Sequence, residues 1–210
     1  MSWAGRSLAS AEGHGGLRAR LRARIAPLHA RLDQAIEASC LGEPLDLLGL
    51  LAIHYAALET IVPALECAGA ARLFSGWDGR SRLAALTADL AALRADPPHW
   101  LNTSVLFLSE PEVWGALYAV EGSRLGNQVL FRRVAKHGND HAQHATQFLA
   151  HCPEAVVAWP RLVKRLEALD YRGDAFEASV RGAEKVFRAY LIATEQRPGR
   201  DRTRTPDAGR

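Results

Sequence analysis

The chain has 210 residues, of which 48% are hydrophobic and 23% are charged, and its formal net charge is +3. These values exclude an intrinsically disordered protein, and the length is sufficient for one large domain with a sizeable core. Leu and Ala are abundant while alternating strand patterns are scarce, which predicts an all-α fold. Five arginines follow Gln196, so the positive charge says little about the folded body.

Signals for export or membrane insertion are missing from the sequence. No apolar run reaches the length of a membrane span, and the N-terminus lacks the apolar core of a signal peptide. Cys40, Cys67 and Cys152 form no paired motif, which favours reduced structural thiols. We therefore expect a cytoplasmic protein with no membrane partner.

The pattern of apolar residues indicates one helical domain over 17–195, with a flexible leader over 1–16 and a disordered basic tail over 196–210. No repeat or linker divides this domain. Helical spacing of apolar residues predicts helices over 17–38, 45–67, 80–95, 109–137, 141–150, 154–169 and 174–195.

Prolines and one capping pair refine these boundaries. Pro27 predicts a kink or a junction within the first helix, and Pro63 predicts a perturbed last turn in the second. Ser109 and Glu112 have the spacing of an N-cap and its N3 partner, which places the start of helix 109–137.

The helix 109–137 contains two glycines in its interior, although each costs a helix roughly 0.5–1 kcal/mol relative to alanine. Trp114, Tyr118, Gly122 and Gly126 are spaced four residues apart, so they form one stripe that ends in bare backbone. Such a stripe serves either a close helix–helix contact or a flat ligand. The polar residues next to the glycines favour the ligand.

Two motifs resemble those of bacterial haem oxygenases. The segment "GALYAVEGSRLGNQVL" is similar to the family's distal-helix signature, commonly "GALYVLEGSxLGG". The segment "LRARIAPLHARLD" is similar to the first-helix motif "LRxxTxxxHxxLD", whose histidine ligates haem iron and corresponds to His29. The resemblance covers roughly residues 17–192. It implies a haem-oxygenase-like helical bundle that holds its ligand between the first helix and a glycine-kinked distal helix.

The resemblance also implies an activity, that of the biliverdin-producing, bacteriophytochrome-associated type. Such enzymes open haem at a meso carbon and release biliverdin, carbon monoxide and ferrous iron, using dioxygen and external electrons. Haem is both substrate and cofactor. His29 would bind the iron, and backbone at Gly122 and Gly126 would leave space above it. Ser123 would hold ordered water on the same side.

Two positions depart from the family pattern. Asn127 replaces the second glycine of the "LGG" pair, and Ile25 replaces the threonine four residues before the histidine. Asn127 would place an amide near the haem, where it would either bond water or oxygen or crowd the ring. The departure therefore concerns catalytic rate and regiochemistry more than haem binding.

The haem propionates require cations or hydroxyl groups. Arg22 lies seven residues before His29, which is two helical turns, and Arg18 lies one turn further. Tyr118 offers a hydroxyl group. From the late helices, the candidate cations are Arg161, Lys164 and Arg165, of which Arg165 is preferred.

The electrons must come from another protein, because the chain has no flavin or nicotinamide fingerprint. A ferredoxin or a flavoprotein reductase is the expected donor, and a biliverdin-binding photoreceptor is a possible downstream partner. An acidic ferredoxin would dock on the arginines of the first helix, namely Arg18, Arg20, Arg22 and Arg24.

Two other functions remain as alternatives. The first is a non-catalytic haem or bilin carrier on the same fold, which Asn127 keeps open. The second is a basic nucleic-acid binder, which is disfavoured because no helix-turn-helix or aromatic–basic pattern is present. The histidines at 137, 141 and 144 are interpreted as a solvated turn and not as a metal site, since Gly138 and Asn139 interrupt their helix. His54 is expected to lie on one face of its helix and to pack against neighbouring residues.

Overall fold

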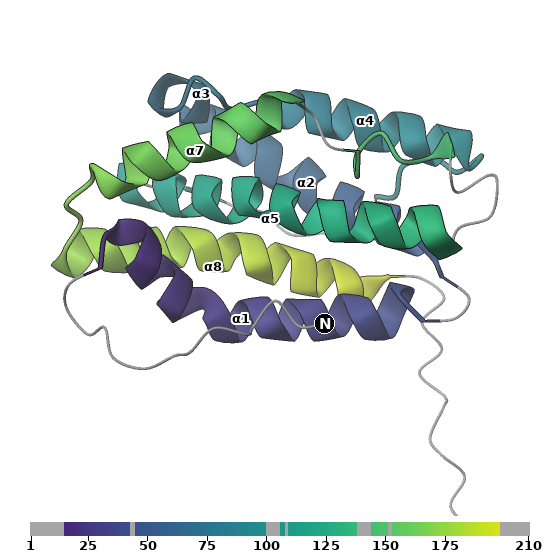
Figure 1. The fold of residues 1–210 in the computed structure, drawn as a ribbon. Helices are drawn as coiled ribbons and strands as arrows, with labels where there is room; N and C mark the ends of the chain where they lie inside the picture. Colours follow the sequence, from purple (N-terminus) through teal and green to yellow (C-terminus); the bar gives the residue numbers. More distant parts are fainter. Residues whose placement is uncertain are drawn as a thin grey trace, which may run out of the picture.

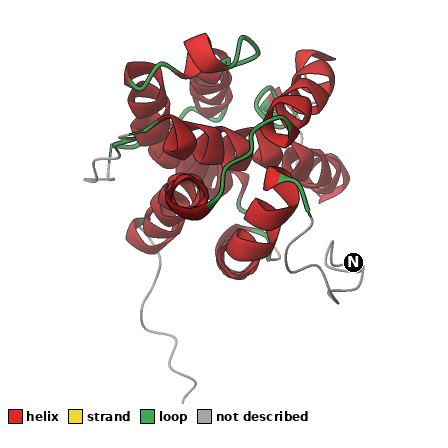
Figure 2. Ribbon diagram, turned by 90° about the vertical axis from the view of Figure 1, so that its left-hand side faces the viewer, coloured by secondary structure: helices red, strands yellow, loops and turns green. Residues whose placement is uncertain are grey.

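The structure, a computed structural model, describes residues 15–42, 45–99, 106–107, 109–137, 144–150 and 153–197. Every regular element within these ranges is helical, which confirms the all-α prediction (Figure 2). The predicted leader and tail lie almost entirely outside the described residues. The helices are α1 (Leu17–Cys40), α2 (Leu47–Cys67), α3 (Ala70–Leu73), α4 (Gly79–Ala92), α5 (Glu110–His137), α7 (Pro153–Glu167) and α8 (Gly173–Gln196).

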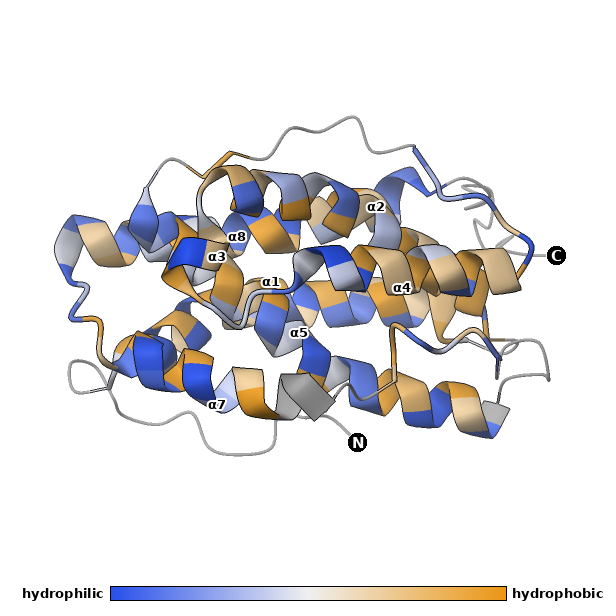
Figure 3. Cartoon of the chain, turned by 90° about the horizontal axis from the view of Figure 1, so that it is seen from above, coloured by the Kyte–Doolittle hydropathy of each residue, from blue (hydrophilic) through white to orange (hydrophobic). Residues whose placement is uncertain are grey.

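Helix α8 lies between α1 and α5 in the bundle (Figure 1). It packs against α1, α2 and α5, while α4 packs against α2 and α7 contacts both α1 and α5. Hydrophobic and hydrophilic residues are mixed along the helices, as expected for elements that bury one side (Figure 3). As a result α1 and α5, the two helices with the recognisable motifs, are both supported by α8.

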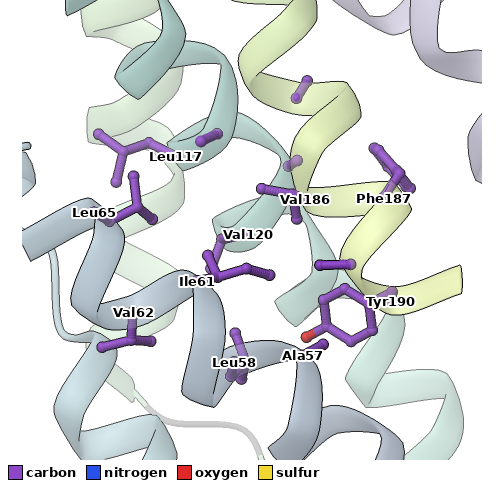
Figure 4. Close-up of a cluster of buried hydrophobic side chains, with 14 of the residues drawn as sticks. Ala57, Leu58, Ile61, Val62, Leu65, Leu117, Val120, Val186, Phe187 and Tyr190 are labelled. Carbon is purple, nitrogen blue, oxygen red and sulfur yellow. The ribbon is translucent and has the colours of Figure 1, made fainter. Parts of the chain in front are cut away.

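The hydrophobic core is built around α2, which is buried over most of its length. Side chains from α2, α5 and α8 meet in its centre (Figure 4). Their contributions are Leu58, Ile61 and Leu65 from α2, Leu117 and Val120 from α5, and Val186, Phe187 and Tyr190 from α8.

Helix α2 also has the length and apolar composition of a membrane-spanning helix, with a mean hydropathy of 1.6 in its most apolar window. Within the structure 67% of that window is buried by the rest of the protein. The central helix of a helical bundle has the same properties. Length and composition are therefore weak grounds for a membrane span in this helix.

Six predicted helices agree with the structure to within three residues at each end. Helix α1 continues through Pro27 and α2 continues through Pro63. The first turns of α1 are inclined to the remainder, in agreement with the predicted kink (Figure 1). Helix α3 was not predicted, because four residues are too short to produce a periodic pattern.

The predicted helix 141–150 is wrong in its second half. Residues 145–150 form turns, and residues 141–143 lie outside the described part of the chain. The carboxylate of Asp89 accepts hydrogen bonds from the backbone N–H groups of Gln147 and Phe148, at 2.9 and 2.8 Å. These bonds satisfy the backbone in a non-helical conformation, which local propensity does not reveal.

Helices α5 and α8 approach each other closely through two glycines. A Cβ atom added to Gly115 would lie 1.8 Å from the carbonyl oxygen of Ser179. A Cβ atom added to Gly182 would lie 1.9 Å from the carbonyl oxygen of Glu112. Backbone therefore meets backbone from both sides, and neither position accommodates a side chain.

We predict that Gly115→Ala lowers the free energy of unfolding by about 2–3 kcal/mol, because the new methyl group forces two helix backbones apart. Gly126→Ala is the matched control on the same helix, since nothing lies within 4 Å of its added Cβ. Alanine is preferred to glycine in a helix, so this variant should gain roughly 0.5–1 kcal/mol. Urea unfolding measures both values, and equal destabilisation at the two positions would contradict the packing described.

Candidate functional site

The two motif glycines of α5 are not used for close helix packing. A Cβ atom added to Gly126 would meet open space, and one at Gly122 would touch only the Trp159 ring, at 3.6 Å. Two neighbouring apolar side chains on this helix are unusually exposed, Leu125 by 44% and Val129 by 63%. The described residues therefore leave an accessible apolar surface beside bare backbone, which favours the ligand interpretation of the stripe.

His29 lies on an exposed side of α1, with 46% of its side chain accessible. Its Nδ1 atom is 3.0 Å from Oδ2 of Asp33, one turn further along the helix. Its ring lies 5.7 Å from the ring of Phe187 on α8, measured between centroids. The hydrogen bond to Asp33 raises the pKa of His29 above its ordinary value, although partial burial and the charge of Arg22 oppose this. A neutral His29 that donates through Nδ1 presents its Nε2 lone pair to a metal.

Tyr118 forms a second part of the site, beside cations from α1. Burial raises the pKa of Tyr118, and the charges of Arg18 and Arg22 act against this increase. The centroid of its ring lies 5.9 Å from that of Trp159 on α7, the side chain that a Cβ atom at Gly122 would touch. Since Arg22 also influences His29, the structure brings these predicted residues into one electrostatic neighbourhood.

The remaining predicted cations are placed differently. The Arg165 guanidinium lies 6.0 Å from the centre of the Trp114 ring, one turn before Tyr118 on α5. Arg18 is also 3.4 Å from the carboxylate of Glu167 on α7, so its charge is partly compensated.

Ser123 and Asn127 turn their polar atoms toward the interior. The Ser123 hydroxyl donates to the carbonyl of Val120 at 2.7 Å and accepts from Nη2 of Arg82 at 3.1 Å. Asn127 is buried, and its Nδ2 atom donates to the carbonyl of Phe148 at 3.5 Å. The expectation that Asn127 presents its amide to the haem is therefore not what the structure shows.

Arg82 is a buried residue that the sequence interpretation missed. It is 6% exposed, and its Nη1 atom donates to the carbonyl of Val120 at 2.9 Å. This guanidinium thus holds the α5 backbone two residues before Gly122. Arg82 shares a helix face with Leu86 and Asp89, and that spacing was the signal available in the sequence.

Behind α5, a buried histidine lies in the same interior region. His54 of α2 is 3.3 Å from the Tyr190 hydroxyl through Nδ1, and its ring packs against Phe148 at 4.8 Å. Its Nε2 atom is buried without a hydrogen-bond partner among the described residues. Burial, assisted by the charge of Arg82, lowers the pKa of His54 to about 3. The prediction that His54 lies on a helix face and packs against its neighbours is confirmed. With this pKa the histidine is neutral at pH 7.

Glu121 is a second buried acid–base group beside Gly122. It is 1% exposed and lies 3.2 Å from Nε of Arg124, one turn further along α5. Burial raises the pKa of Glu121, while the charges of Arg82 and Arg124 lower it. The sequence placed this glutamate in the motif but gave no reason to expect its burial.

We predict that His54 makes the protein less stable as the pH falls. Below the ordinary histidine pKa of 6.5 the unfolded chain binds a proton that the folded protein cannot bind until about pH 3. Relative to His54→Gln, the wild-type free energy of unfolding should therefore drop by about 2 kcal/mol between pH 7 and pH 5. Urea unfolding at several pH values measures this difference, and parallel curves would show that His54 titrates normally.

Comparisons with known proteins relate the chain to haem oxygenases. A scan against profiles of protein families finds no match. Among curated proteins, the chain is 34% identical over 135 residues to a protein of Xanthomonas campestris pv. campestris (strain 8004) named "Heme oxygenase". The aligned part covers 59% of this chain and 74% of that protein.

A solved structure has a similar fold. The NO- and CO-bound heme oxygenase from Neisseria meningitidis matches with a TM-score of 0.66 and 22% sequence identity. The match covers 87% of this chain and 92% of the other. At this level of identity the comparison establishes the fold.

Proposed function

The chain belongs to the haem oxygenase family and degrades haem, and we propose that His29 binds the iron while Gly122 and Gly126 face the opposite side of the ring. The observation that carries this proposal is the contrast between the glycines of α5. The backbone of α8 occupies the space that a side chain at position 115 would need, whereas the corresponding space at Gly126 is open. A helix that needed its glycines only for packing would not leave one of them unopposed.

When bound, haem supplies an iron centre that activates dioxygen, and the porphyrin itself is the group oxidised. The task of His29 is to offer a neutral imidazole to the iron. Asp33 supports this role, because a carboxylate on Nδ1 fixes the tautomer and the orientation of the ring and makes Nε2 more basic.

The α5 surface suits the flat, largely apolar face of haem. Bare backbone at Gly122 and Gly126 permits the haem ring to approach the helix closely. The bound ring would also cover the exposed apolar side chains of Leu125 and Val129, which is favourable because it removes apolar surface from water. The ring of Trp159 borders the same space next to Gly122. No bulky side chain of the described residues occupies the position above Gly126, so space for dioxygen and water is retained there.

The propionates are assigned to Arg22, Arg18 and Tyr118. The charges of Arg18 and Arg22 both lower the pKa of Tyr118, and the charge of Arg22 also lowers that of His29. Arg165 is proposed as a supporting cation that packs on Trp114 below Tyr118.

Ser123 is proposed to hold water through its hydroxyl oxygen. Arg82 uses one of the two lone pairs of that oxygen, and the proton is donated to Val120. The second lone pair can accept from a water molecule. Asn127 is assigned a different role from the one expected, namely support of the turn that contains Phe148.

A non-catalytic carrier on the same fold is not favoured. The Xanthomonas campestris relative, which aligns with this chain over 74% of its own length, is named as a heme oxygenase. The bacteriophytochrome-associated branch, a photoreceptor partner and a cytoplasmic location stay predictions.

The test of this function combines haem binding with turnover. We predict that the wild-type protein binds haem with a histidine-ligated Soret spectrum, and that ascorbate and oxygen convert this spectrum to that of a bilin. His29→Ala should lose this ligation, because a single imidazole holds the iron. Absorption spectroscopy measures both steps. An unchanged Soret position and haem affinity in His29→Ala would identify another ligand.

A second variant separates an enzyme from a carrier. Gly126→Leu adds a side chain into open space, so it should leave the fold and His29 intact but obstruct the oxygen-binding side. The expected result is a haem complex without turnover. Normal turnover in this variant would remove Gly126 from the site.

We propose that an external ferredoxin or flavoprotein reductase supplies the electrons. The first-helix arginines are less available for docking than expected from the sequence. Arg24 forms a bidentate pair with Glu177 at 2.8 and 3.0 Å, and Arg20 donates to the Tyr171 carbonyl at 2.7 Å. Charge reversal at these positions would therefore disturb internal contacts as well as docking.

The salt response of the wild-type protein is a cleaner test of that docking surface. We predict that turnover with an acidic ferredoxin falls steeply as salt rises, because the Debye length shrinks from about 30 Å at 0.01 M to about 3 Å at 1 M. Turnover with ascorbate should change little, since a small reductant needs no docking surface. The same salt response with both donors would rule out electrostatic docking.

A further inference from the structure

The guanidinium of Arg133 connects α5 to the C-terminal turn of α1. The Nη1 and Nη2 atoms of Arg133 are each 3.0 Å from a different carboxylate oxygen of Glu37, which is a bidentate pair. Nη2 also donates to the carbonyl of Leu41, the C-cap residue that follows α1. Helices from distant parts of the sequence are thus connected through a single side chain.

This pair lies in line with the proposed haem site on both helices. On α5, Arg133 follows Gly126 by seven residues and returns to the same face, about 10 Å further along the axis. On α1, Glu37 continues the row formed by His29 and Asp33, about 12 Å beyond His29. The two distances are similar, so the pair stands at one end of the space between the proposed iron ligand and the bare backbone.

The other end of α5 is fixed by different means. Gly115 holds the helix against α8 through backbone contact, and the open stretch begins two turns later at Gly122. The accessible surface of α5 is therefore bounded by a backbone contact before it and by the Arg133–Glu37 pair after it.

The C-terminus of α1 depends on cations from other helices. Its own last turn contains no basic residue. Arg133 from α5 and Arg197, which directly follows α8, take that place, and Arg197 donates to the Ser39 carbonyl at 3.1 Å. Positive charge at a helix C-terminus complements its dipole. Arg197 fixes α1 to its support α8, whereas Arg133 fixes it to the opposite wall, α5.

We propose that Arg133 and Glu37 are positioning residues that set the separation of α1 and α5 at one end of the proposed haem site, a latch that controls how firmly haem is held. This inference rests on the proposed function. The latch differs from a stabilising salt bridge, because its side chains are 37% and 57% exposed, and such pairs contribute little to global stability.

The chain offers a matched control in Arg24 and Glu177. That pair is also bidentate, its side chains are 49% and 46% exposed, and it also starts from α1. It ends on α8, the supporting helix, and does not reach α5. Removing it changes the same kind of interaction without affecting the connection between the two proposed walls.

The experiment compares Glu37→Ala, Arg133→Ala, their double variant and the control Glu177→Ala. Haem release is measured by transfer from the haem-loaded protein to excess apomyoglobin, and thermal unfolding is measured without haem. We expect Glu37→Ala to release haem roughly two- to fivefold faster, within the range expected for one exposed charge pair. The double variant should resemble Arg133→Ala, which already loses both the pair with Glu37 and the contact with Leu41, and Glu177→Ala should match the wild type.

Equal release rates for Glu37→Ala and Glu177→Ala would overturn the proposal, as would additive effects in the double variant. Hydrogen exchange without haem gives an independent reading. Amides of residues 34–41 should exchange faster in Glu37→Ala than in Glu177→Ala, and equal exchange would also overturn the latch. Failure of the wild-type protein to take up haem would instead refute the proposed function, which keeps the two outcomes distinguishable.

Discussion

The close approach of α5 and α8 through Gly115 and Gly182 is the constraint on which the rest of the structure depends. Each glycine admits a carbonyl oxygen of the other helix to a position that a Cβ atom would occupy. The contact fixes the first turns of α5, whereas Gly122 and Gly126, further along the same helix, are not opposed by α8. Since α8 also supports α1, one helix determines where both motifs lie.

Buried polar groups then define the interior side of α5. Arg82 holds the Val120 carbonyl and the Ser123 hydroxyl, and Asp89 holds the backbone of the turn at Phe148. Phe148 in turn packs on His54. A buried guanidinium that lacked these hydrogen bonds would cost a large amount of free energy. Arrangements of α4 against α5 that break the bonds of Arg82 are therefore disfavoured.

The sequence predicted the helices, because periodicity carries that information. The grouping of His29, Arg22 and Tyr118 in one site was an expectation from the family resemblance, and it stays a prediction. The sequence could not distinguish Gly115 from Gly126, since both are small residues on one helix and only their neighbours differ. Arg82 and Glu121 were also missed as buried groups, because burial of a charge depends on partners from other helices. The turn at 145–150 was missed for the same reason, as Asp89 lies far away in the sequence.

A surface made of backbone has a consequence for how such an enzyme can diverge. At Gly126 every substitution adds atoms, so mutation can only narrow the space there and never widen it. Variation in the shape or orientation of the bound ring must therefore arise from the side chains around it, such as Trp159, Leu125 and Val129. Related chains that differ in product would be expected to vary at these flanking positions and to retain the bare position itself.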